Sequence, residues 1–515
     1  IDDKKLKNIT SPSVENLLVG KAPGVQVSSA SGQPGQAGKI VIRGRGSLSG
    51  STDPLWVVDG VIMGNSGGDL NPADIENVTI LKDAASTAIY GSQGANGVIQ
   101  VTTKSAKEGK ITINFSGKLV GTWLNNGPME MMNGSELYDL YSSFSNYDIA
   151  PEYKDKNFDW WDSAAKTGFA HEYNLSIGGG SETVRSYASV GYYEEEGAIK
   201  SLNLKRYNLL AKLEFKPYKF LTLRPMVSGS YRKTDDRQGG AVGNMYANMP
   251  WDSPYKEDGS LVSRGKDAGW FAGSRTNYMY DQQWNFVKRE RTEVNVNMDF
   301  DVKLTDWLTF ASVNSYKFSK NESKSLEDPR SMAGEGAIGK GRVEDTYRNY
   351  ERVYTNQLLR VNKAFGDHYI NAVVGYEWNE INTKWNRSSA TGIPAGFIVQ
   401  EAAANPEAAV GGQQSEAVQS YLANVNYTYS DRYVGQVSFR RDGASNFGPD
   451  NRYGNFYSIS AGWNIHNESF FKAKDVINNL KLRASYGSQG KRPDAAYGHL
   501  YLYNTGLNQS YNGET

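Results

Sequence analysis

The sequence contains no cysteine and only four histidines among its 515 residues. The absence of cysteine excludes disulfide bonds, thiolate catalysis and cysteine-ligated metals. None of the histidines has a second ligand three or four residues away, as a zinc site requires. They are scattered at His171, His368, His466 and His499. We therefore expect no metal site and no cofactor.

Neither sign of charge is in excess, because 56 Lys and Arg residues balance 56 Asp and Glu residues. This balance removes the electrostatic argument for a nucleic-acid partner. Apolar runs of roughly 20 residues, the length of a membrane helix, are lacking, although a membrane β-barrel does not need them. Proline is scarce and no linker-like stretch divides the sequence after residue 110, so we expect one large architecture.

The stretch 71–104 has the features of a small folded module. Asn71 stands before a proline, as a helix cap does, and Asp74 lies where a capping box places a carboxylate. Gly91 is expected to end a second helix. The module is predicted to contain strands over 78–81 and 97–103 and a helix over 84–90.

The glycine-rich run 32–39 does not match a phosphate-binding loop. Gln33 and Ile40 occupy the positions that require a glycine and a hydroxyl, so we interpret the run as a turn. The strand that follows carries Arg43 and Arg45 on one side. Such a strand can bind anions or form internal ion pairs, and we favour the ion pairs.

From residue 110 onward, apolar and polar residues alternate strictly over long segments. Period-two alternation predicts strands with one apolar face and one polar face. Their length of roughly ten residues or more exceeds that of globular strands and matches a tilted strand that spans a membrane. The clearest segments are 111–116, 207–215, 293–301 and 457–465.

Short and long connections alternate along this part of the chain. Tight turns are expected at 179–181, 217–218, 305–306, 366–367 and 430–431, and long loops near 123–170, 235–283, 323–344 and 386–417. A barrel with short turns at one rim and long loops at the other gives this order, and we count roughly fourteen strands. Aromatic residues gather near the strand ends, as in interfacial girdles; packing of aromatics in a soluble β core is the alternative.

Seven sequence motifs stand out. They are GKAPGVQV, IRGRGSL, PLWVVDGV, LNPADIE and ILKDAASTAIYGSQGANGVI in the first hundred residues, and FRRDGASNFGPDNRYGNF and LKLRASYG later. Together they resemble the SusC/RagA branch of TonB-dependent outer-membrane transporters. The resemblance implies an antiparallel membrane β-barrel, with 22 strands when complete, and an α+β plug domain inside the lumen. We assign the plug to 1–106 and the first part of the barrel to 107–515.

The resemblance also implies function and partners. It implies TonB-dependent active import of bulky nutrients across the outer membrane of a Gram-negative bacterium. The implied partners are a SusD-like surface lipoprotein, TonB with ExbB and ExbD, and outer-membrane lipid, with a dimer of transporter–lipoprotein pairs as one assembly. Relatives carry a TonB box before the plug and further strands after it, so we expect this sequence to be a piece of a longer protein.

The plug is predicted to be held at rest by polar contacts that can exchange with water one at a time. By likeness to the IRG motif of relatives, Arg43 is predicted to pair with a lumen carboxylate, and Arg45 belongs to the same predicted latch. Gln93 stands where many relatives have arginine, which puts a second arginine latch there in doubt. The candidate carboxylates are Glu214, Glu293, Asp299 and Glu377.

Aromatic residues in the loops near 123–170 and 235–285 are candidates for cargo contact. They are Trp160, Trp161, Trp251, Tyr255, Trp270, Tyr278, Tyr280 and Trp284. Flat aromatic side chains with polar neighbours suit stacking on sugar rings. Packing of loop on loop, or contact with the lipoprotein, is an equal alternative. Oligosaccharide is our first hypothesis for the cargo and oligopeptide the second.

An enzyme or a surface adhesin rich in β-structure is the competing class. An enzyme would need a catalytic constellation, and the sequence has no Gly-x-Ser-x-Gly elbow, no His/Glu metal motif and no distinctive carboxylate pair. We therefore expect a protein that is not an enzyme.

Overall fold

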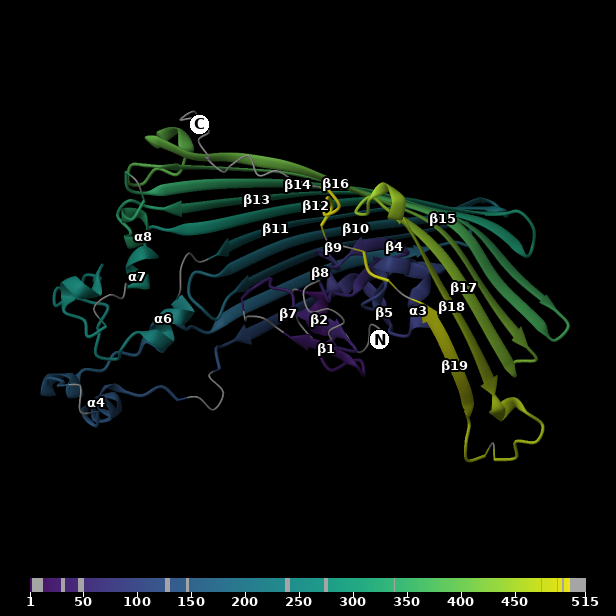
Figure 1. Cartoon of the computed structure of the whole chain (residues 1–515), viewed down its shortest axis with the longest axis horizontal. Helices are drawn as coiled ribbons and strands as arrows, with labels where there is room; N and C mark the ends of the chain where they lie inside the picture. Colours follow the sequence, from purple (N-terminus) through teal and green to yellow (C-terminus); the bar gives the residue numbers. More distant parts are fainter. Residues whose placement is uncertain are drawn as a thin grey trace.

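The computed structural model of the chain describes residues 1, 13–28, 33–44, 51–125, 130–144, 148–236, 241–272, 277–337, 339–473, 475–488, 490–492 and 495–500. The largest element of the structure is one curved antiparallel sheet (Figure 1). Each strand is hydrogen-bonded to its neighbours in sequence, from β7 at one edge to β19 at the other. This up-and-down order is the one that a β-barrel requires.

In the described residues the sheet has thirteen strands, close to the roughly fourteen that the alternation predicted. They are β7 (Gly109–Thr122), β8 (Gly168–Gly180), β9 (Val184–Glu196), β10 (Asn203–Tyr218), β11 (Leu221–Asp236), β12 (Phe286–Lys303), β13 (Leu308–Glu327), β14 (Arg342–Phe365), β15 (His368–Thr391), β16 (Asn405–Tyr429), β17 (Tyr433–Ala444), β18 (Tyr453–Asn464) and β19 (Lys481–Ser488).

The two faces of the sheet differ in polarity, as the alternation predicted. On β12, Val296 and Met298 are 43% and 50% exposed on the convex face, whereas Glu293 and Asn297 are each 4% exposed on the concave face. A sheet with an apolar outer face and a polar inner face is the arrangement of a membrane β-barrel. The predicted fold class is therefore confirmed.

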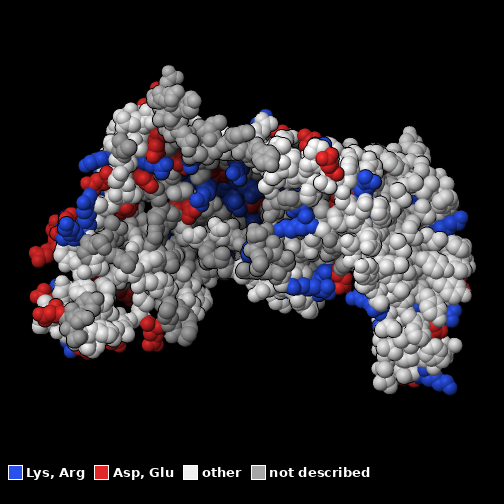
Figure 2. Space-filling view, viewed as in Figure 1, with Lys and Arg blue, Asp and Glu red and all other residues white. Residues whose placement is uncertain are grey.

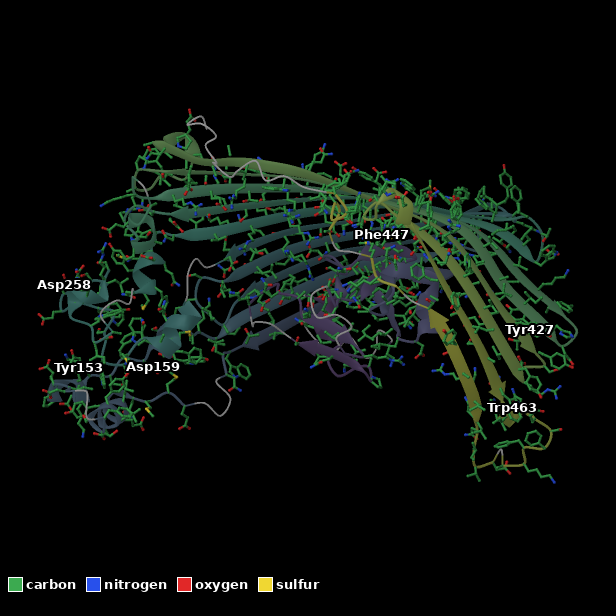
Figure 3. All side chains as sticks on the ribbon, in the orientation of Figure 1. Tyr153, Asp159, Asp258, Tyr427, Phe447 and Trp463 are labelled. Atoms are coloured by element: carbon green, nitrogen blue, oxygen red, sulfur yellow. The ribbon has the colours of Figure 1, made fainter. Side chains whose placement is uncertain are left out.

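The connections gather at two rims of the sheet (Figure 1). The short-turn rim contains the connections 181–183, 219–220, 304–307, 366–367 and 430–432, together with the longer 465–480 that holds η7 (Ile465–Asn467). The long-loop rim contains the described residues of the connections 123–167, 197–202, 237–285, 328–341, 392–404 and 445–452. Figure 3 places Tyr427 and Trp463 near the short-turn rim and Tyr153 and Asp159 near the long-loop rim.

The long-loop rim also carries the helices of this part of the chain. They are α4 (Gly134–Ser142), η3 (Pro151–Asp155), α5 (Trp160–Ala164), α6 (Ala241–Ala247), η4 (Gly265–Ala268), α7 (Tyr278–Asp281), α8 (Met332–Glu335), η5 (Gln400–Ala402) and η6 (Pro449–Asn451). Nowhere in the described ranges does a helix combine the length and the apolar character needed to cross a membrane.

Several predicted connections differ in their bounds from the structure: the turn expected at 179–181 lies at 181–183, and the loop expected near 323–344 is 328–341. The long loop expected over 386–417 is only 392–404, because β15 and β16 continue their pairing almost to their ends. The turn expected at 217–218 lies at 219–220, since Tyr218 still pairs with Leu221 as the last residue of β10.

The described residues of the N-terminal hundred form the plug, which lies against the concave face of the sheet (Figure 1). Its elements are α2 (Val14–Leu17), β1 (Val25–Ser28), β2 (Lys39–Ile42), β3 (Leu55–Val58), β4 (Val61–Gly64), η1 (Pro72–Asp74), β5 (Ile75–Leu81), α3 (Ala84–Thr87), η2 (Ala88–Gln93) and β6 (Val98–Thr103). The strands pair as β1-β2 and as β4-β3-β6-β5. A core that includes Leu17, Trp56 and Ile99 holds these elements together.

The predicted helix over 84–90 is interrupted in the structure. It consists of α3 and the 3₁₀ segment η2, and Gly91 lies inside η2 with φ 55° and ψ −134° instead of ending the helix. Likewise, Asn71 caps only the short turn η1, by accepting a hydrogen bond from the Ala73 amide. Both segments, η1 and η2, contact the sheet.

Candidate functional site at the plug–barrel interface

The η2 segment of the plug docks on a buried ion cluster of the sheet. Arg440 of β17 is 1% exposed and bonds Glu377 of β15 at 2.6 Å and Asp442 at 2.5 Å. The plug adds its own contacts, because Arg440 Nη1 donates to the Ile89 carbonyl at 2.8 Å and Asp442 accepts from the Ser92 amide and hydroxyl at 2.9 and 3.0 Å. A buried ion cluster that includes backbone partners demands an accurate fit between plug and sheet.

Gly91 permits this fit. Its backbone conformation lies in a region that side-chain-bearing residues rarely adopt. An added Cβ would stand 2.2 Å from Asp442 Oδ2 and 2.7 Å from Arg440 Nε. Gly91, the first glycine of the segment YGSQGANG, is therefore required for the close approach of the plug backbone to the ion pair.

Asp69 of the plug docks on cations at the middle of the sheet. It pairs with Arg232 of β11 at 2.9 Å and lies 3.4 Å from Arg291 Nε of β12. Glu293 in turn holds Arg291 and Lys317, each at 2.8 Å. Lys and Arg side chains gather in the hollow of the concave face (Figure 2). Arg232 and Arg291 are direct cross-strand neighbours, so the shared plug carboxylate offsets their repulsion.

The turn η1 docks on β8 and β9. Asp74 accepts hydrogen bonds from Ser189 at 2.6 Å and from Tyr187 at 3.2 Å, and Asn71 donates to Asn174 at 2.8 Å. Burial raises the pKa of Asp74, and the hydrogen bonds from Ser189 and Tyr187 act in the opposite direction. Asp74, placed in a capping box by the sequence, thus uses its carboxylate to hold the plug against the sheet.

Asp59, in the turn between β3 and β4, makes a fourth contact. Lys212 of β10 pairs with it at 2.9 Å and also donates to the Thr103 carbonyl at 3.3 Å. The Thr103 amide and hydroxyl donate to the same carboxylate. This ion pair therefore ties the end of the plug sheet to β10.

The polarity of docking is opposite to the predicted latch. At Asp59 and Asp69, plug carboxylates meet sheet cations, whereas Arg43 pairs with Asp83 of the plug itself at 2.5 Å, with 56% and 37% of the two side chains exposed. The predicted pairing of Arg43 with a lumen carboxylate is thus wrong in this structure. Arg45 lies outside the described residues.

The four predicted lumen carboxylates have partners in the sheet. Glu214 lies within 3.6 Å of Arg185, Lys216 and Arg224, and Asp299 accepts from the Asn314 amide. Glu293 and Glu377 belong to the two clusters described above, so they act on the plug through the cations that they hold. The motifs PLWVVDGV and FRRDGASNF contain Asp59, Arg440 and Asp442, but the sequence alone assigns these residues no role.

Four of the eight aromatic cargo candidates are packed inside the long-loop rim. Trp160, Trp251, Trp270 and Tyr278 are 3–7% exposed, and the three indole N–H groups donate to backbone carbonyls 2.8–3.0 Å away. These four residues therefore hold the loops together, which was the alternative to cargo contact.

The other four aromatic candidates are more accessible. Tyr255 is 45% exposed, and Trp161 and Tyr280 are half-buried. Trp284 is also half-buried, and the guanidinium of Arg330 lies 3.7 Å from the centre of its ring. Among the described residues there is no group of three or more potential metal ligands.

Known proteins resemble this chain along its whole length. The family model of the TonB-dependent Receptor Plug Domain matches residues 1–98. TonB-dependent receptor P39 of Formosa agariphila is 30% identical, over 98% of this chain and 49% of that protein. TonB-dependent receptor SusC of Bacteroides thetaiotaomicron is 29% identical, over 100% of this chain and 54% of that protein.

Solved structures agree in fold. The RagAB peptide importer in its open-open state superposes with a TM-score of 0.83 at 23% identity, over 98% of this chain and 60% of that one. The chain spans about half the length of the curated relatives that it matches. These relatives are receptors and transporters and not enzymes, as the sequence led us to expect. The chain belongs to the SusC/RagA-type TonB-dependent transporters.

Proposed function

We propose that this chain is part of an importer that moves bulky nutrients across the outer membrane of a Gram-negative bacterium, driven by TonB. The observation that carries the proposal is a plug docked through polar pairs on the inner face of a sheet whose outer face is apolar. Such pairs exchange with water at small net cost. A plug held in this way closes the lumen at rest and yields to a pull from the periplasm.

The partners follow from the same proposal. A SusD-like lipoprotein covers the long-loop rim, TonB with ExbB and ExbD supplies the pull, and outer-membrane lipid surrounds the apolar face. A dimer of transporter–lipoprotein pairs is the assembly we propose to test. The neutral net charge of the chain supports the expectation that nucleic acid is not a partner.

The cargo has two candidates. Oligosaccharide is the first, and Tyr255 and Trp161 are the aromatic residues that are free enough to stack on a sugar. Oligopeptide is the second, and the likeness to a peptide importer favours it. Burial of Trp160, Trp251 and Trp270 removes much of the aromatic argument for sugar.

Uptake in cells tests the proposal. Cells with and without the gene receive labelled oligosaccharides or oligopeptides, with and without a protonophore that removes the energy source of TonB. Import that needs both the gene and the energy source supports the function, and the label that enters identifies the cargo class. Uptake that is independent of energy would refute it. Extraction from membranes without detergent would favour the adhesin instead.

A further inference from the structure

The plug is attached unequally to the strands around it. On one side, α3 and η2 lie against β16–β19 (Figure 1). There Arg440 is 1% exposed, and its Nε, Nη1 and Nη2 atoms all donate hydrogen bonds to carboxylates, a hydroxyl or the plug backbone. This contact is dry and its donors are satisfied, so water has no ready access to replace it.

The opposite side of the plug faces a cavity of about 550 Å³. The cavity lies between plug strands β3 and β6 and the short-turn ends of β9–β14, and its wall carries both signs of charge. The charged lining residues are Asp59, Arg185, Lys212, Glu214, Arg224, Asp299, Asp301 and Arg360. A mixed wall of this kind accommodates hydrated, polar molecules of either charge.

A second, smaller cavity of about 50 Å³ lies beside the first, and Asp59, Thr103 and Asn297 line both. Three oxygen atoms of uncharged side chains around the smaller cavity have no hydrogen-bond partner: Ser230 Oγ, Asn295 Oδ1 and Asn297 Oδ1. Unpaired oxygens in a polar cavity can accept hydrogen bonds from water or from cargo. The two cavities form a seam along the plug, and the Asp59–Lys212 pair lies between them.

We propose that cargo passes along this seam, between the plug sheet and β10–β13, while α3 and η2 stay docked on β16–β19. This inference rests on the proposed import function. Asp59–Lys212 is the gate between the two cavities, and Asp69 with Arg232 closes the seam further toward the long-loop rim. Opening exchanges these ion pairs for water or for charged groups of the cargo.

The lack of cysteine provides a direct test, because introduced cysteines are the only thiols in this chain. Two pairs of variants place a cysteine on the plug and one on the sheet. Asp59→Cys with Lys212→Cys spans the seam, and Asp83→Cys with Arg483→Cys spans the contact between plug and β19. Each double variant replaces an aspartate and a cation that lie in contact, so the same short bis-maleimide can bridge the two cysteines in each.

Energy-dependent uptake is measured in whole cells that express each variant from the protein's own gene. Bridging the seam is expected to abolish uptake, whereas bridging Asp83→Cys to Arg483→Cys is expected to leave uptake intact. The same variants are also treated with N-ethylmaleimide, which modifies each cysteine without linking the two, so the effect of modification is measured apart from that of bridging. The unbridged Asp59→Cys/Lys212→Cys variant is also expected to leak small solutes more than the other pair.

Loss of uptake in both bridged proteins would show that the plug leaves as one body and would overturn the inference. Uptake that survives both bridges would also overturn it, because cargo would then pass elsewhere. Absence of energy-dependent uptake in the unmodified protein would instead refute the proposed function itself.

Discussion

Gly91→Ala is the sharpest test of plug docking. The added methyl group would lie 2.2 Å from Asp442 Oδ2 and 2.7 Å from Arg440 Nε, and both side chains are buried and bonded. If docking is kept, backbone strain and displacement of a buried ion partner together cost roughly 4–8 kcal/mol. Releasing η2 instead forfeits the hydrogen bonds of Ser92 and Ile89 to charged groups, each worth about 1.5–3 kcal/mol.

The two costs are similar, so we expect a large fraction of the variant plugs to have η2 released. The measurement is ion conductance of the purified protein in planar bilayers, supported by sensitivity of cells to antibiotics too large for ordinary porins. Gly20→Ala is the matched control, because Gly20 also has positive φ but nothing lies within 4 Å of its added Cβ. Wild-type conductance in Gly91→Ala, with heat-modifiable migration showing a folded barrel, would refute the reasoning.

Arg43→Ala is expected to change the ion conductance little, because the half-exposed pair of Arg43 with Asp83 is worth about 0–1 kcal/mol. A conductance as high as that of Gly91→Ala would contradict this. Trp160→Ala is expected to destabilise the long-loop rim by about 3–5 kcal/mol, since the indole is 3% exposed, and unchanged limited proteolysis of the loops would contradict it. The hydrogen bonds from Arg330 hold the pKa of Asp328 below its usual range. Asp328→Asn therefore removes stability that is present above the unfolded pKa of about 3.9 and disappears as pH falls through the folded pKa. The backbone amides that follow β13 should exchange hydrogen faster in Asp328→Asn than in the wild type at neutral pH. Below both pKa values, the exchange rates of the two proteins should be equal.

The barrel is predictable from the sequence because its signal is local. Alternation such as that over 293–301 requires only that one face be apolar, and the order of short and long connections follows from the up-and-down topology. The strand ends are less predictable, since β15 and β16 extend their pairing through polar residues that look like a loop.

Plug docking is not predictable in the same way. Ser92 and Asp442 are 350 residues apart in the chain, and one sequence contains no information about which charges meet across such a distance. The assignment of Arg43 to the latch followed the habit of relatives, whereas in the structure Arg43 pairs with Asp83 of the plug itself. Four of the eight aromatic candidates are buried inside the long-loop rim, and the sequence does not distinguish a tryptophan that packs a loop core from one that stacks on a sugar.

The polar character of docking explains how a tight seal can also be released. Separating an apolar contact costs about 25 cal/mol of free energy for each Å² of apolar surface that returns to water, and water forms no bond that compensates. A hydrogen bond exchanged for water costs only about 0.5–1.5 kcal/mol net, and this holds where water can reach the groups. Water has space beside the Asp59–Lys212 pair and little beside Arg440, which is 1% exposed. A steady pull on the plug should therefore break the hydrated contacts first and leave the dry contact as the last to yield.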